Sequence, residues 1–491
     1  MVRRRFRGHA RPARFDRNLV VIGAGSAGLV SAYIAAALRA SVTLVEKDRM
    51  GGDCLNTGCV PSKALLRSAA FRRQVMRASD LGFRSASVDF DFADVMQRVQ
   101  RVVRTIEPHD SVERYTKLGV ECLGGAARIT SPWSVEVDGR PLTTRGIILA
   151  TGARPFVPPL EGIEKSGYLT SDTIWTIRKL PGRLLVLGGG PIGCEMAQAF
   201  ARLGSRVVLV EMLPRILPRE DEDVSARLSG RLTAEGVELR TGYRVLRFEG
   251  ASGSRRAICA HPEGELAIEF DAVLVAIGRK PNTEDLGLDA AGVEITERGT
   301  VRVDDGLRTT CPTIHACGDV AGPYQFTHTA SHQAWYATVN ALLGGLKRFR
   351  VDYSVIPWAT FTDPEVARVG LNEAEAREQG IAHEVTTFDI AELDRAITDE
   401  AAEGVVKVLT PPGKDRILGA TIVGPHAGEL IAEYVLAMKH GLGLKKILGT
   451  IHIYPTLMEA NRFAAGNWRR AHTPEGILRW VERFHRWRRG G

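Results

Sequence analysis

Two cysteines and a lysine lie close together in the stretch GGDCLNTGCVPSK, residues 51–63. Four residues separate Cys54 from Cys59, and Lys63 follows one helical turn later. A thiolate is the species that exchanges with disulfides or binds a metal, and a neighbouring cation favours the thiolate. The chain has only seven cysteines among 491 residues, which is no disulfide framework and favours a reducing, cytoplasmic compartment. In such a compartment a close cysteine pair is typical of a catalytic or metal-binding site.

A structural zinc site would need a second pair of ligands with metal spacing. The sequence contains no such pair, so we predict no metal site. The remaining cysteines lie in strand-like or helix-like patterns and are predicted to be packing residues: Cys122, Cys194, Cys259, Cys311 and Cys317.

The first element that must position the pair is a nucleotide-binding turn. Residues 18–48 have the pattern of a buried strand, a glycine turn, a helix and a second strand that ends at Glu46. Gly23, Gly25 and Gly28 form G-x-G-x-x-G, which allows a tight turn, a close pyrophosphate and close helix–strand packing. The helix amides are expected to hold the phosphates, and Glu46 is expected to accept the ribose hydroxyls.

The same unit recurs over residues 182–215, so two dinucleotides are predicted. Its glycines repeat the spacing of the first turn: Gly188, Gly190 and Gly193. Glu211 ends its second strand and favours the free ribose hydroxyl of NAD. Arg215 weakens that preference, because an arginine can neutralise the extra phosphate of NADP. Three shorter runs, 146–155, 272–282 and 313–322, each read as a buried strand that ends in a turn.

Taken together, these residues closely resemble the class I pyridine nucleotide-disulfide oxidoreductases, which include dihydrolipoamide dehydrogenase, glutathione reductase and mercuric reductase. The most specific feature is C-x-x-x-x-C-V-P-S-K downstream of the first glycine turn. The resemblance implies an α/β fold with two nested, doubly wound, Rossmann-like dinucleotide-binding domains and a C-terminal α+β dimerisation domain. The implied boundaries are 18–155 and 280–348 for the FAD-binding domain, 156–279 for the NAD(P)-binding domain and 349–467 for the interface domain.

The resemblance also implies the cofactor contacts, which match the family's motifs position by position. The FAD contacts are Gly23, Gly25, Ser26, Ala27, Gly28, Glu46, Lys47, Gly52, Lys63, Ala127, Thr151, Gly152, Asp319, Thr327 and His328. The NAD contacts are Gly188, Gly190, Pro191, Ile192, Gly193, Glu211 and Gly278, with NADP not excluded.

By the same resemblance, Cys54 and Cys59 form a redox-active disulfide beside the flavin. Cys59 is then the thiolate next to the ring, stabilised by Lys63, and Cys54 exchanges with substrate. Lys63 is expected near flavin N5, paired with Glu195. The cysteine pair is thus interpreted as an electron relay.

The sequence departs from the family pattern at IHIYPTLMEANRFAAG, near the end of the interface domain. Dithiol-handling relatives have a histidine before Pro-Thr, oriented by a glutamate that corresponds to Glu459, but here Tyr454 occupies that place. A phenol with a pKa of ~10 is a poor base near neutrality, whereas imidazole at ~6.5 suits the task. If the segment is extended, His452 lies on the same side as Tyr454 and either substitutes for the base or is an interface histidine. Mercuric reductases share the tyrosine, yet their vicinal cysteines and metal-binding module are not seen here.

Basic residues gather at both ends of the chain, so the net charge of +8 indicates no nucleic-acid-binding body. Residues 1–17 are predicted to be a disordered basic tail, with a transit peptide as the alternative. Residues 468–491 are predicted to form a basic amphipathic helix, capped by Thr473 with Pro474 in its first turn. That helix either packs on the enzyme's own dimer, lies on an anionic membrane or docks a partner.

We therefore predict a homodimeric FAD enzyme that transfers electrons between NAD(P)H and a small-molecule or protein-bound disulfide or dithiol. The reaction is expected to be most like that of dihydrolipoamide dehydrogenase. A metal-ion reductase of the mercuric type is the first alternative, and a non-catalytic redox sensor or partner-binding flavoprotein is the second.

Overall fold

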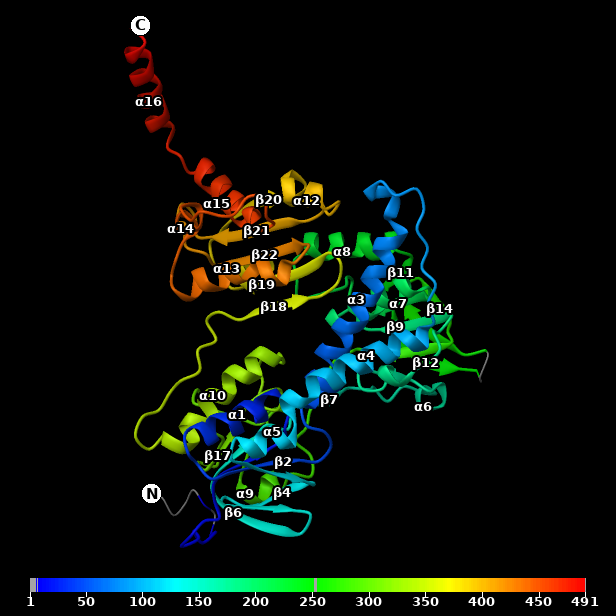
Figure 1. Ribbon diagram of the computed structural model, residues 1–491, viewed down its shortest axis with the longest axis vertical. Coiled ribbons are helices and arrows are strands. Elements are labelled where there is room, and N and C mark those ends of the chain that lie inside the picture. Colours follow the sequence, from blue (N-terminus) through cyan, green and yellow to red (C-terminus); the bar gives the residue numbers. More distant parts are fainter. Residues whose placement is uncertain (1–5, 7, 251–253, 491) are drawn as a thin grey trace. The chain divides into compact units, whose positions relative to one another are not determined.

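The computed structural model describes residues 6, 8–250 and 254–490, which form two compact units (Figure 1). The first unit contains the described residues up to Arg73, together with Val88–Met212 and Gly242–Asp352. The second contains Gln74–Ser87, Leu213–Thr241 and the described chain from Tyr353 onward.

The first unit contains a seven-stranded sheet, in which β1 (Arg17–Ile22) lies between β2 (Val42–Glu46) and β6 (Arg140–Leu149). Its strand order is β3 (Val120–Gly124), β2, β1, β6, β5 (Ser134–Val137) and β4 (Ala127–Ser131), with β17 (Ile314–Ala316) beside β6. Strands β1, β2, β3, β6 and β17 pair in parallel. Alternate side chains of β1 enter two different hydrophobic clusters, because layers cover both faces of a parallel sheet.

Helices α1 (Ser26–Ala37) and α10 (Thr327–Leu343) pack against each other on one face of this sheet (Figure 1). Helix α1 follows β1 directly, which places its N-terminus at the carboxyl end of the sheet. Parallel α/β sheets bind their ligands at that edge. The first predicted nucleotide site is thereby positioned by β1, β2 and α1.

A second parallel sheet in the same unit has the order β10 (Arg206–Glu211), β9 (Arg183–Leu187), β15 (Ala272–Val275) and β8 (Leu169–Thr170). Helix α7 (Pro191–Leu203) follows β9. Two antiparallel sheets complete this part: β12 (Arg244–Glu249), β13 (Arg256–His261) and β14 (Gly264–Glu269), and β7 (Ala153–Pro155) with β16 (Arg279–Pro281). The pattern strand, glycine turn, helix, strand therefore occurs twice.

Three helices carry or support the cysteine segment. Cys54 lies in the short helix α2 (Gly52–Asn56), and Cys59 is the first residue of α3 (Cys59–Met76). Helix α4 (Phe92–Ile106) is capped by Asp91, whose carboxylate accepts from the amide of Ala93. Further helices of the two units are α5 (Val112–Lys117), α6 (Ile163–Ser166), α8 (Glu222–Ala234), α9 (Leu288–Ala291), α11 (Glu373–Glu378) and α12 (Asp394–Thr398).

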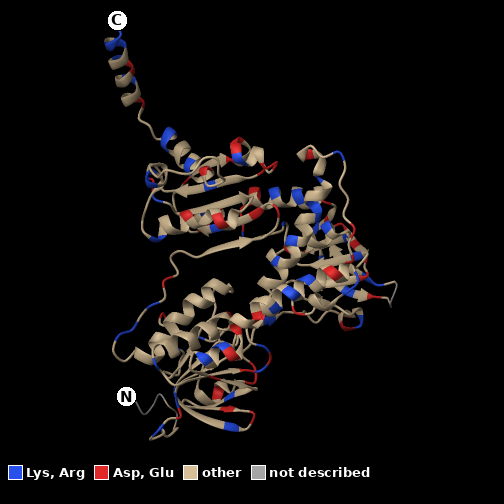
Figure 2. Cartoon of the chain, viewed as in Figure 1, with Lys and Arg blue, Asp and Glu red and all other residues tan. Residues whose placement is uncertain are grey.

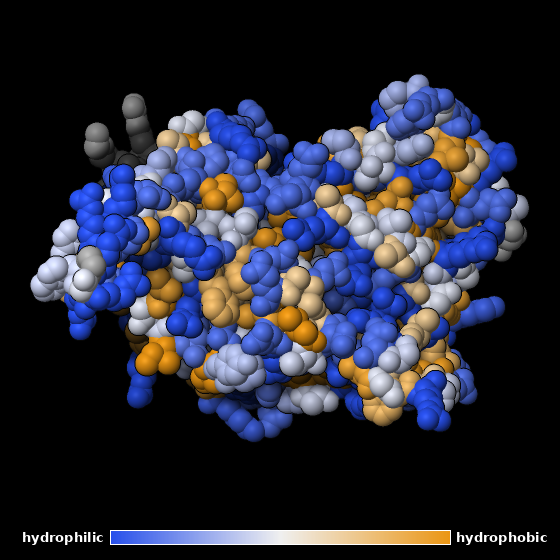
Figure 3. Space-filling model, turned by 90° about the horizontal axis from the view of Figure 1, so that it is seen from above, coloured by the Kyte–Doolittle hydropathy of each residue, from blue (hydrophilic) through white to orange (hydrophobic). Residues whose placement is uncertain are grey.

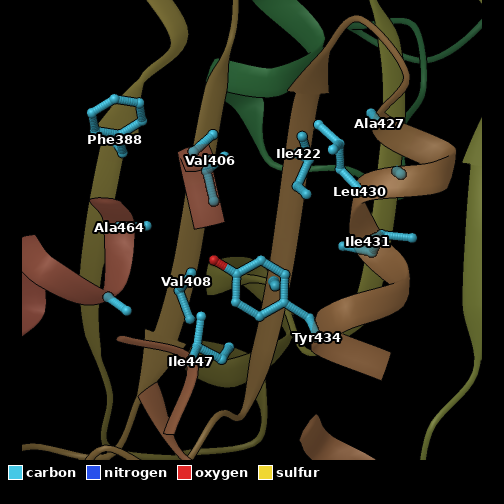
Figure 4. Packing of buried hydrophobic residues seen from close by; sticks show 14 of the residues in the cluster. Phe388, Val406, Val408, Ile422, Ala427, Leu430, Ile431, Tyr434, Ile447 and Ala464 are labelled. Atoms are coloured by element: carbon cyan, nitrogen blue, oxygen red, sulfur yellow. The ribbon is translucent and has the colours of Figure 1, made fainter. Parts of the chain in front are cut away.

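The second unit is an antiparallel sheet covered by helices. Its strand order is β18 (Pro357–Thr360), β19 (Glu365–Gly370), β22 (Gly419–Gly424), β21 (Val405–Thr410) and β20 (Glu384–Asp389). Its helices include α13 (Ala427–Lys439), α14 (Leu444–Leu448) and α15 (Glu459–Ala471). Figure 4 shows their shared core, in which Tyr434 and Ile431 of α13 face Val408 and Ile422 of the sheet. The expected α/β fold with two Rossmann-like sheets and a C-terminal α+β domain is confirmed.

The two ends of the chain differ from expectation. Residues 1–5 and 7 of the expected basic tail lie outside the described residues. The rest of that segment contacts the first sheet: Phe6 packs on Trp133 with ring centroids 4.5 Å apart, and the Asp16 carboxylate accepts from the amide of Thr143. At the other end, residue 468 still belongs to α15, and a separate helix α16 begins only at Glu475 (Glu475–Arg488).

Hydrophilic and hydrophobic residues are interspersed on the face seen in Figure 3. Among the described helices, none combines the length and the apolar character that a membrane span requires.

The C-terminal core should depend on Trp468, which is 1% exposed and donates its ring N–H to Glu384 over 2.9 Å. Trp468→Ala removes a large buried side chain and one of the donors to the Glu384 carboxylate, which keeps the Thr410 hydroxyl as a donor. We expect a loss of about 3–5 kcal/mol in the free energy of unfolding. Thermal unfolding followed by circular dichroism should show a midpoint lower by several degrees. Trp480→Ala, at a site that is 65% exposed, is the matched control and should leave the midpoint unchanged. Equal midpoints for the two variants would contradict this assignment.

Candidate active site

The first glycine turn has no room for side chains. A Cβ added at Gly28 would lie 1.7 Å from the carbonyl oxygen of Gly23, so α1 packs directly on the turn. The Glu46 carboxylate at the end of β2 accepts from the amide of Ala24 over 2.6 Å. A Cβ at Gly52 would lie 2.6 Å from the Cα of Gly25, so the cysteine segment lies against the same turn. These close approaches fit a dinucleotide held between the turn and α2.

The second turn repeats this geometry in detail. A Cβ added at Gly193 would lie 1.8 Å from the carbonyl oxygen of Gly188. The Glu211 carboxylate at the end of β10 accepts from the amide of Gly189 over 2.6 Å. Two cradles with the same glycine contact and the same acid contact support two dinucleotides in one chain.

The thiol of Cys59 lies between three other side chains of the first unit. Its sulfur is 3.5 Å from the hydroxyl of Thr327, the first residue of α10, and it shares a hydrogen bond with the thiol of Cys54. Lys63 lies four residues further along α3, on the same helix face. The structure therefore brings together the cysteine pair, Lys63 and Thr327, all next to the first glycine turn.

The shared hydrogen bond favours different protonation states for the two thiols. The hydrogen bond from Cys54 lowers the pKa of Cys59 to about 6, and Thr327 and the Lys63 ammonium act in the same direction. The hydrogen bond to Cys59 and burial raise the pKa of Cys54 far above its ordinary value. Cys59 is thus the preferred thiolate, which is the species that stacks on or attacks an electron acceptor.

An ion pair connects the cysteine helix to the second cradle. Lys63 Nζ lies 2.9 Å from Glu195 Oε2, and the Glu195 side chain on α7 is only 6% exposed. A buried carboxylate needs a paired cation, so this contact restrains α3 against α7. The resemblance to the disulfide oxidoreductases had predicted Glu195 as the partner of Lys63.

Asp319, which is half-buried and follows β17, lies beside Arg279, the first residue of β16. Burial raises the pKa of Asp319, and Arg279 Nε lies 3.5 Å from its carboxylate. Arg279 also contacts the carboxylate of Asp53, the neighbour of Cys54, and donates to the carbonyl of Ala153 over 2.6 Å. Arg279 was not predicted from the sequence, although it directly follows Gly278 in the run 272–282, which was predicted to be a strand that ends in a turn. Its partner Asp53 is 226 residues away, so no local pattern could indicate the contact.

The strand end at Thr151 and Gly152 is held by Asn282. The Thr151 hydroxyl donates to the backbone carbonyl of Asn282 over 2.7 Å. The backbone N–H of Asn282 donates to the carbonyl of Gly152 over 3.0 Å. The other predicted contacts lie at element ends: Ser26 and Ala27 open α1, Lys47 follows β2, Gly52 opens α2, Ala127 opens β4, His328 is in the first turn of α10, Pro191 and Ile192 open α7, and Gly278 precedes β16.

The predicted acid–base residues lie in the second unit, and they do not share one environment. The His452 side chain is 4% exposed; its Nε2 lies 2.9 Å from Glu433 and its Nδ1 lies 3.0 Å from the carbonyl of Thr450. Tyr454 is 67% exposed, and its hydroxyl donates to Asp394 over 3.0 Å, which raises the pKa of the phenol. The segment forms no strand, so the condition under which both side chains were expected on one side is not met.

Glu459, the predicted orienting acid, is 5% exposed and accepts from the amide of Thr456 over 3.3 Å. Of the five cysteines predicted to pack, Cys122 is half-buried and the others are buried. The described residues contain no group of three or more histidine, cysteine, aspartate or glutamate side chains that could hold a metal ion.

Two nucleotide cradles, with a thiolate-forming cysteine pair beside the first, define an oxidoreductase that joins nicotinamide chemistry to thiols. Residues 17–334 match the pyridine nucleotide-disulphide oxidoreductase family, and residues 356–465 match the dimerisation domain of that family. The chain belongs to the pyridine nucleotide-disulphide oxidoreductase family. The resemblance seen in the sequence is confirmed at this level, and FAD and NAD(P)H are the cofactors of the class.

Individual relatives cover nearly the whole chain. A dihydrolipoyl dehydrogenase of Chlamydia muridarum is 37% identical over 446 residues, which is 90% of this chain and 94% of the relative. A mercuric reductase of Bacillus cereus is 33% identical over 450 residues, 92% of this chain and 71% of the relative. The solved structure of the HOCl-induced flavoprotein disulfide reductase RclA from Escherichia coli has a TM-score of 0.81 at 30% identity, covering 91% of this chain and 99% of that one.

The close contact at Gly28 should be essential for flavin binding. In Gly28→Ala the new methyl group collides with the Gly23 carbonyl, so α1 must move away from the phosphate-binding turn. We expect flavin affinity to fall about tenfold or more, or 1.4 kcal/mol and above. The ratio of flavin to protein absorbance after dialysis measures the loss. Gly230→Ala in α8, where an added Cβ meets no atom within 4 Å, should retain its flavin. Full flavin retention by Gly28→Ala would contradict the cradle assignment.

The thiolate assignment predicts how alkylation of Cys59 depends on pH. Only the thiolate reacts, so iodoacetamide labelling of Cys59 in the reduced holoenzyme should rise with pH around a midpoint near 6. In Cys54→Ala the main hydrogen bond to Cys59 is lost, and the midpoint should move up towards the ordinary value of 9.0. Peptide mass spectrometry reports the labelled residue, and Cys122→Ala is the control that should keep the parent midpoint. A parent midpoint near the ordinary thiol value would show that Cys59 is not the stabilised thiolate.

Proposed function

We propose that this enzyme transfers electrons between NAD(H) and a disulfide or dithiol substrate through Cys54 and Cys59, most like dihydrolipoamide dehydrogenase. The observation that supports this most directly is the unequal thiol pair beside the first cradle, with the Cys59 pKa lowered and the Cys54 pKa raised. The dimerisation domain supports a homodimer. The small number of cysteines supports a cytoplasmic location.

The first glycine turn, the amides that open α1 and Glu46 would hold FAD, which would supply two-electron redox chemistry between the nicotinamide and the Cys54–Cys59 pair. Reduction of the Cys54–Cys59 disulfide takes two electrons and one proton, because Cys59 stays a thiolate beside the Lys63 ammonium. The proton remains on Cys54, which must lose it before its sulfur can attack a substrate disulfide. The proposed roles are therefore stabilisation of charge for Cys59 and Lys63, and exchange with substrate for Cys54.

NAD is the proposed nicotinamide nucleotide. Glu211 lies at the second cradle, where it would accept the free ribose hydroxyls of NAD and would repel the phosphate of NADP. The Arg215 guanidinium points to the carbonyls of Pro218 and Glu220, at 3.4 and 3.5 Å. This arginine is thus engaged within its own loop, which supports the preference for NAD.

A metal-ion reductase of the mercuric type is the second candidate, and Tyr454 favours it. Both ring nitrogens of His452 face oxygen acceptors, so the imidazole has no lone pair directed at a substrate. Tyr454 holds its proton tightly against Asp394. Neither His452 nor Tyr454 is therefore placed as a general base for a dithiol substrate. The exposed phenol of Tyr454 is compatible with binding a metal-ion substrate. The similarity to mercuric reductases agrees with this reading.

A substrate panel with one preparation of holoenzyme separates the two candidates. NADH turnover with lipoamide and other disulfides should exceed NADPH turnover with mercuric ion. Cys54→Ser should abolish turnover of disulfides, since it removes the exchanging sulfur. Faster reduction of mercuric ion would favour the second candidate. A reducible flavin with no turnover of either substrate class would contradict both.

The missing base gives a gain-of-function prediction. Tyr454→His restores an imidazole at the position used by dithiol-handling relatives, and we expect lipoamide kcat/KM to rise about tenfold or more. The gain should be confined to neutral and higher pH, because the imidazole must be unprotonated to act. Tyr454→Phe, which removes the same hydroxyl without adding a base, is the control and should show no gain. An unchanged rate in Tyr454→His would show that the base is not what limits disulfide turnover.

A further inference from the structure

Helix α16 presents a continuous apolar face that nothing in the described chain covers. Its large side chains recur at helical spacing: Ile477, Trp480, Val481, Phe484 and Trp487. Trp480 is 65% exposed and Trp487 is 72% exposed. No residue of α16 is buried, and the hydrophobic core of the second unit ends at Trp468 on the preceding helix. The described core of the second unit is therefore formed without α16, and the apolar face of this helix is exposed.

Basic residues outnumber acidic residues along α16, as the colouring of this helix in Figure 2 shows. Between residues 475 and 489 there are five arginines and two glutamates, a difference of +3: Arg479, Arg483, Arg486, Arg488 and Arg489 against Glu475 and Glu482. Glu482 pairs with Arg486 over 3.1 Å, which leaves the arginines in clear excess. Helical spacing places Arg479, Arg486 and Arg489 opposite the apolar face together with the two glutamates, whereas Arg488 lies over the Phe484 ring, 5.9 Å from its centroid. A surplus of arginines on a helix with a face of tryptophan and phenylalanine is the composition of a helix that lies in a lipid interface.

We propose that α16 anchors the enzyme to the surface of a membrane rich in anionic phospholipid. The helix lies in the plane of the headgroups, with its aromatic face about 5–10 Å below them. Tryptophan rings suit the headgroup depth, and the arginines extend towards the lipid phosphates. At about 21 Å the helix is too short to span a bilayer, so it holds the enzyme on the surface.

Charge selects a lipid surface over a second copy of the chain. Two copies of α16 that meet through their apolar faces bring together two helices with an excess of positive charge, and like charges repel. The match to the family's dimerisation domain ends at residue 465, before α16 begins, so the helix is an addition to that interface. The phosphates of a nucleic acid would pair with the arginines but would leave the apolar face exposed to water. An anionic bilayer pairs its phosphates with the arginines and also buries the apolar face.

Vesicle co-sedimentation of the FAD-loaded dimer tests the proposal. With vesicles in which about a third of the lipid is phosphatidylglycerol, binding should exceed binding to phosphatidylcholine vesicles about tenfold or more, and high salt should weaken it severalfold. Trp480→Glu places a charge in the apolar face and should reduce binding about tenfold. Leu346→Glu is its control, because it adds the same charge at an apolar residue that is 89% exposed elsewhere.

A second pair of variants tests the arginines of α16. Arg483→Gln with Arg486→Gln should lower binding to anionic vesicles roughly tenfold. Arg101→Gln with Arg104→Gln, at the same helical spacing on α4, should leave it unchanged. NADH oxidation with the soluble substrate should be the same for all variants, which keeps this outcome separate from the proposed redox function. Equal binding to both vesicle types would overturn the proposal. So would a Trp480→Glu variant that keeps full vesicle binding but sediments as a smaller assembly, since α16 would then contact a second copy.

Discussion

The ion pair between Lys63 and Glu195 is the interaction on which the arrangement of the first unit depends. It joins α3, which begins at Cys59, to α7, which begins at the second glycine turn. The buried Glu195 carboxylate is tolerated because the Lys63 ammonium accompanies it. The pair also has an electrostatic effect on the reaction site: Lys63 lowers the pKa of Cys59, and Glu195 raises it, as a smaller contribution. One contact therefore joins the cysteine helix α3 to the helix of the second cradle and affects the charge on the Cys59 thiol.

The two cradles show how a local rule builds a site twice. In each, the second strand ends in a glutamate that accepts from a backbone amide of the glycine turn, over 2.6 Å in both cases. This contact orients the carboxylate before any ribose arrives, so little ordering remains for the ligand to impose. The third glycine brings helix and turn so close that a methyl group would collide. Such requirements lie within about thirty consecutive residues, which is the length of a βαβ unit.

The sequence predicted the parts of the structure that obey such local rules, and it failed where distant residues meet. Glycine spacing and strand-terminal acids indicated both cradles without further information. Arg279 was missed because its partners Asp53 and Asp319 come from separate segments of the chain. The common orientation of His452 and Tyr454 was predicted only for an extended segment, and the structure assigns no strand there.

The termini illustrate the same limit. The start signal at Thr473 and Pro474 predicted the beginning of the last helix to within two residues, but the predicted segment 468–491 also included the end of α15. Trp468 belongs to α15, where its ring packs in the core and donates to Glu384. A break before Glu475 then starts α16, whose equally large side chains remain exposed. Burial depends on which elements pack nearby, so two tryptophan-containing helical stretches of similar composition have opposite environments.

The proposed redox residues and the proposed acid–base residues lie in different units of the chain. Everything that joins nucleotide to thiol lies in the first unit: both cradles, the cysteine pair and the ion pair that links them. These parts must remain constant for the electron transfer to work, whatever the final acceptor. The residues that differ from the dithiol pattern lie in the second unit, where His452 is engaged by Glu433 and an exposed Tyr454 is engaged by Asp394. A phenol held by a carboxylate does not remove a proton near neutrality, so in the proposed function Tyr454 affects the choice of substrate and the cysteine pair carries the electrons.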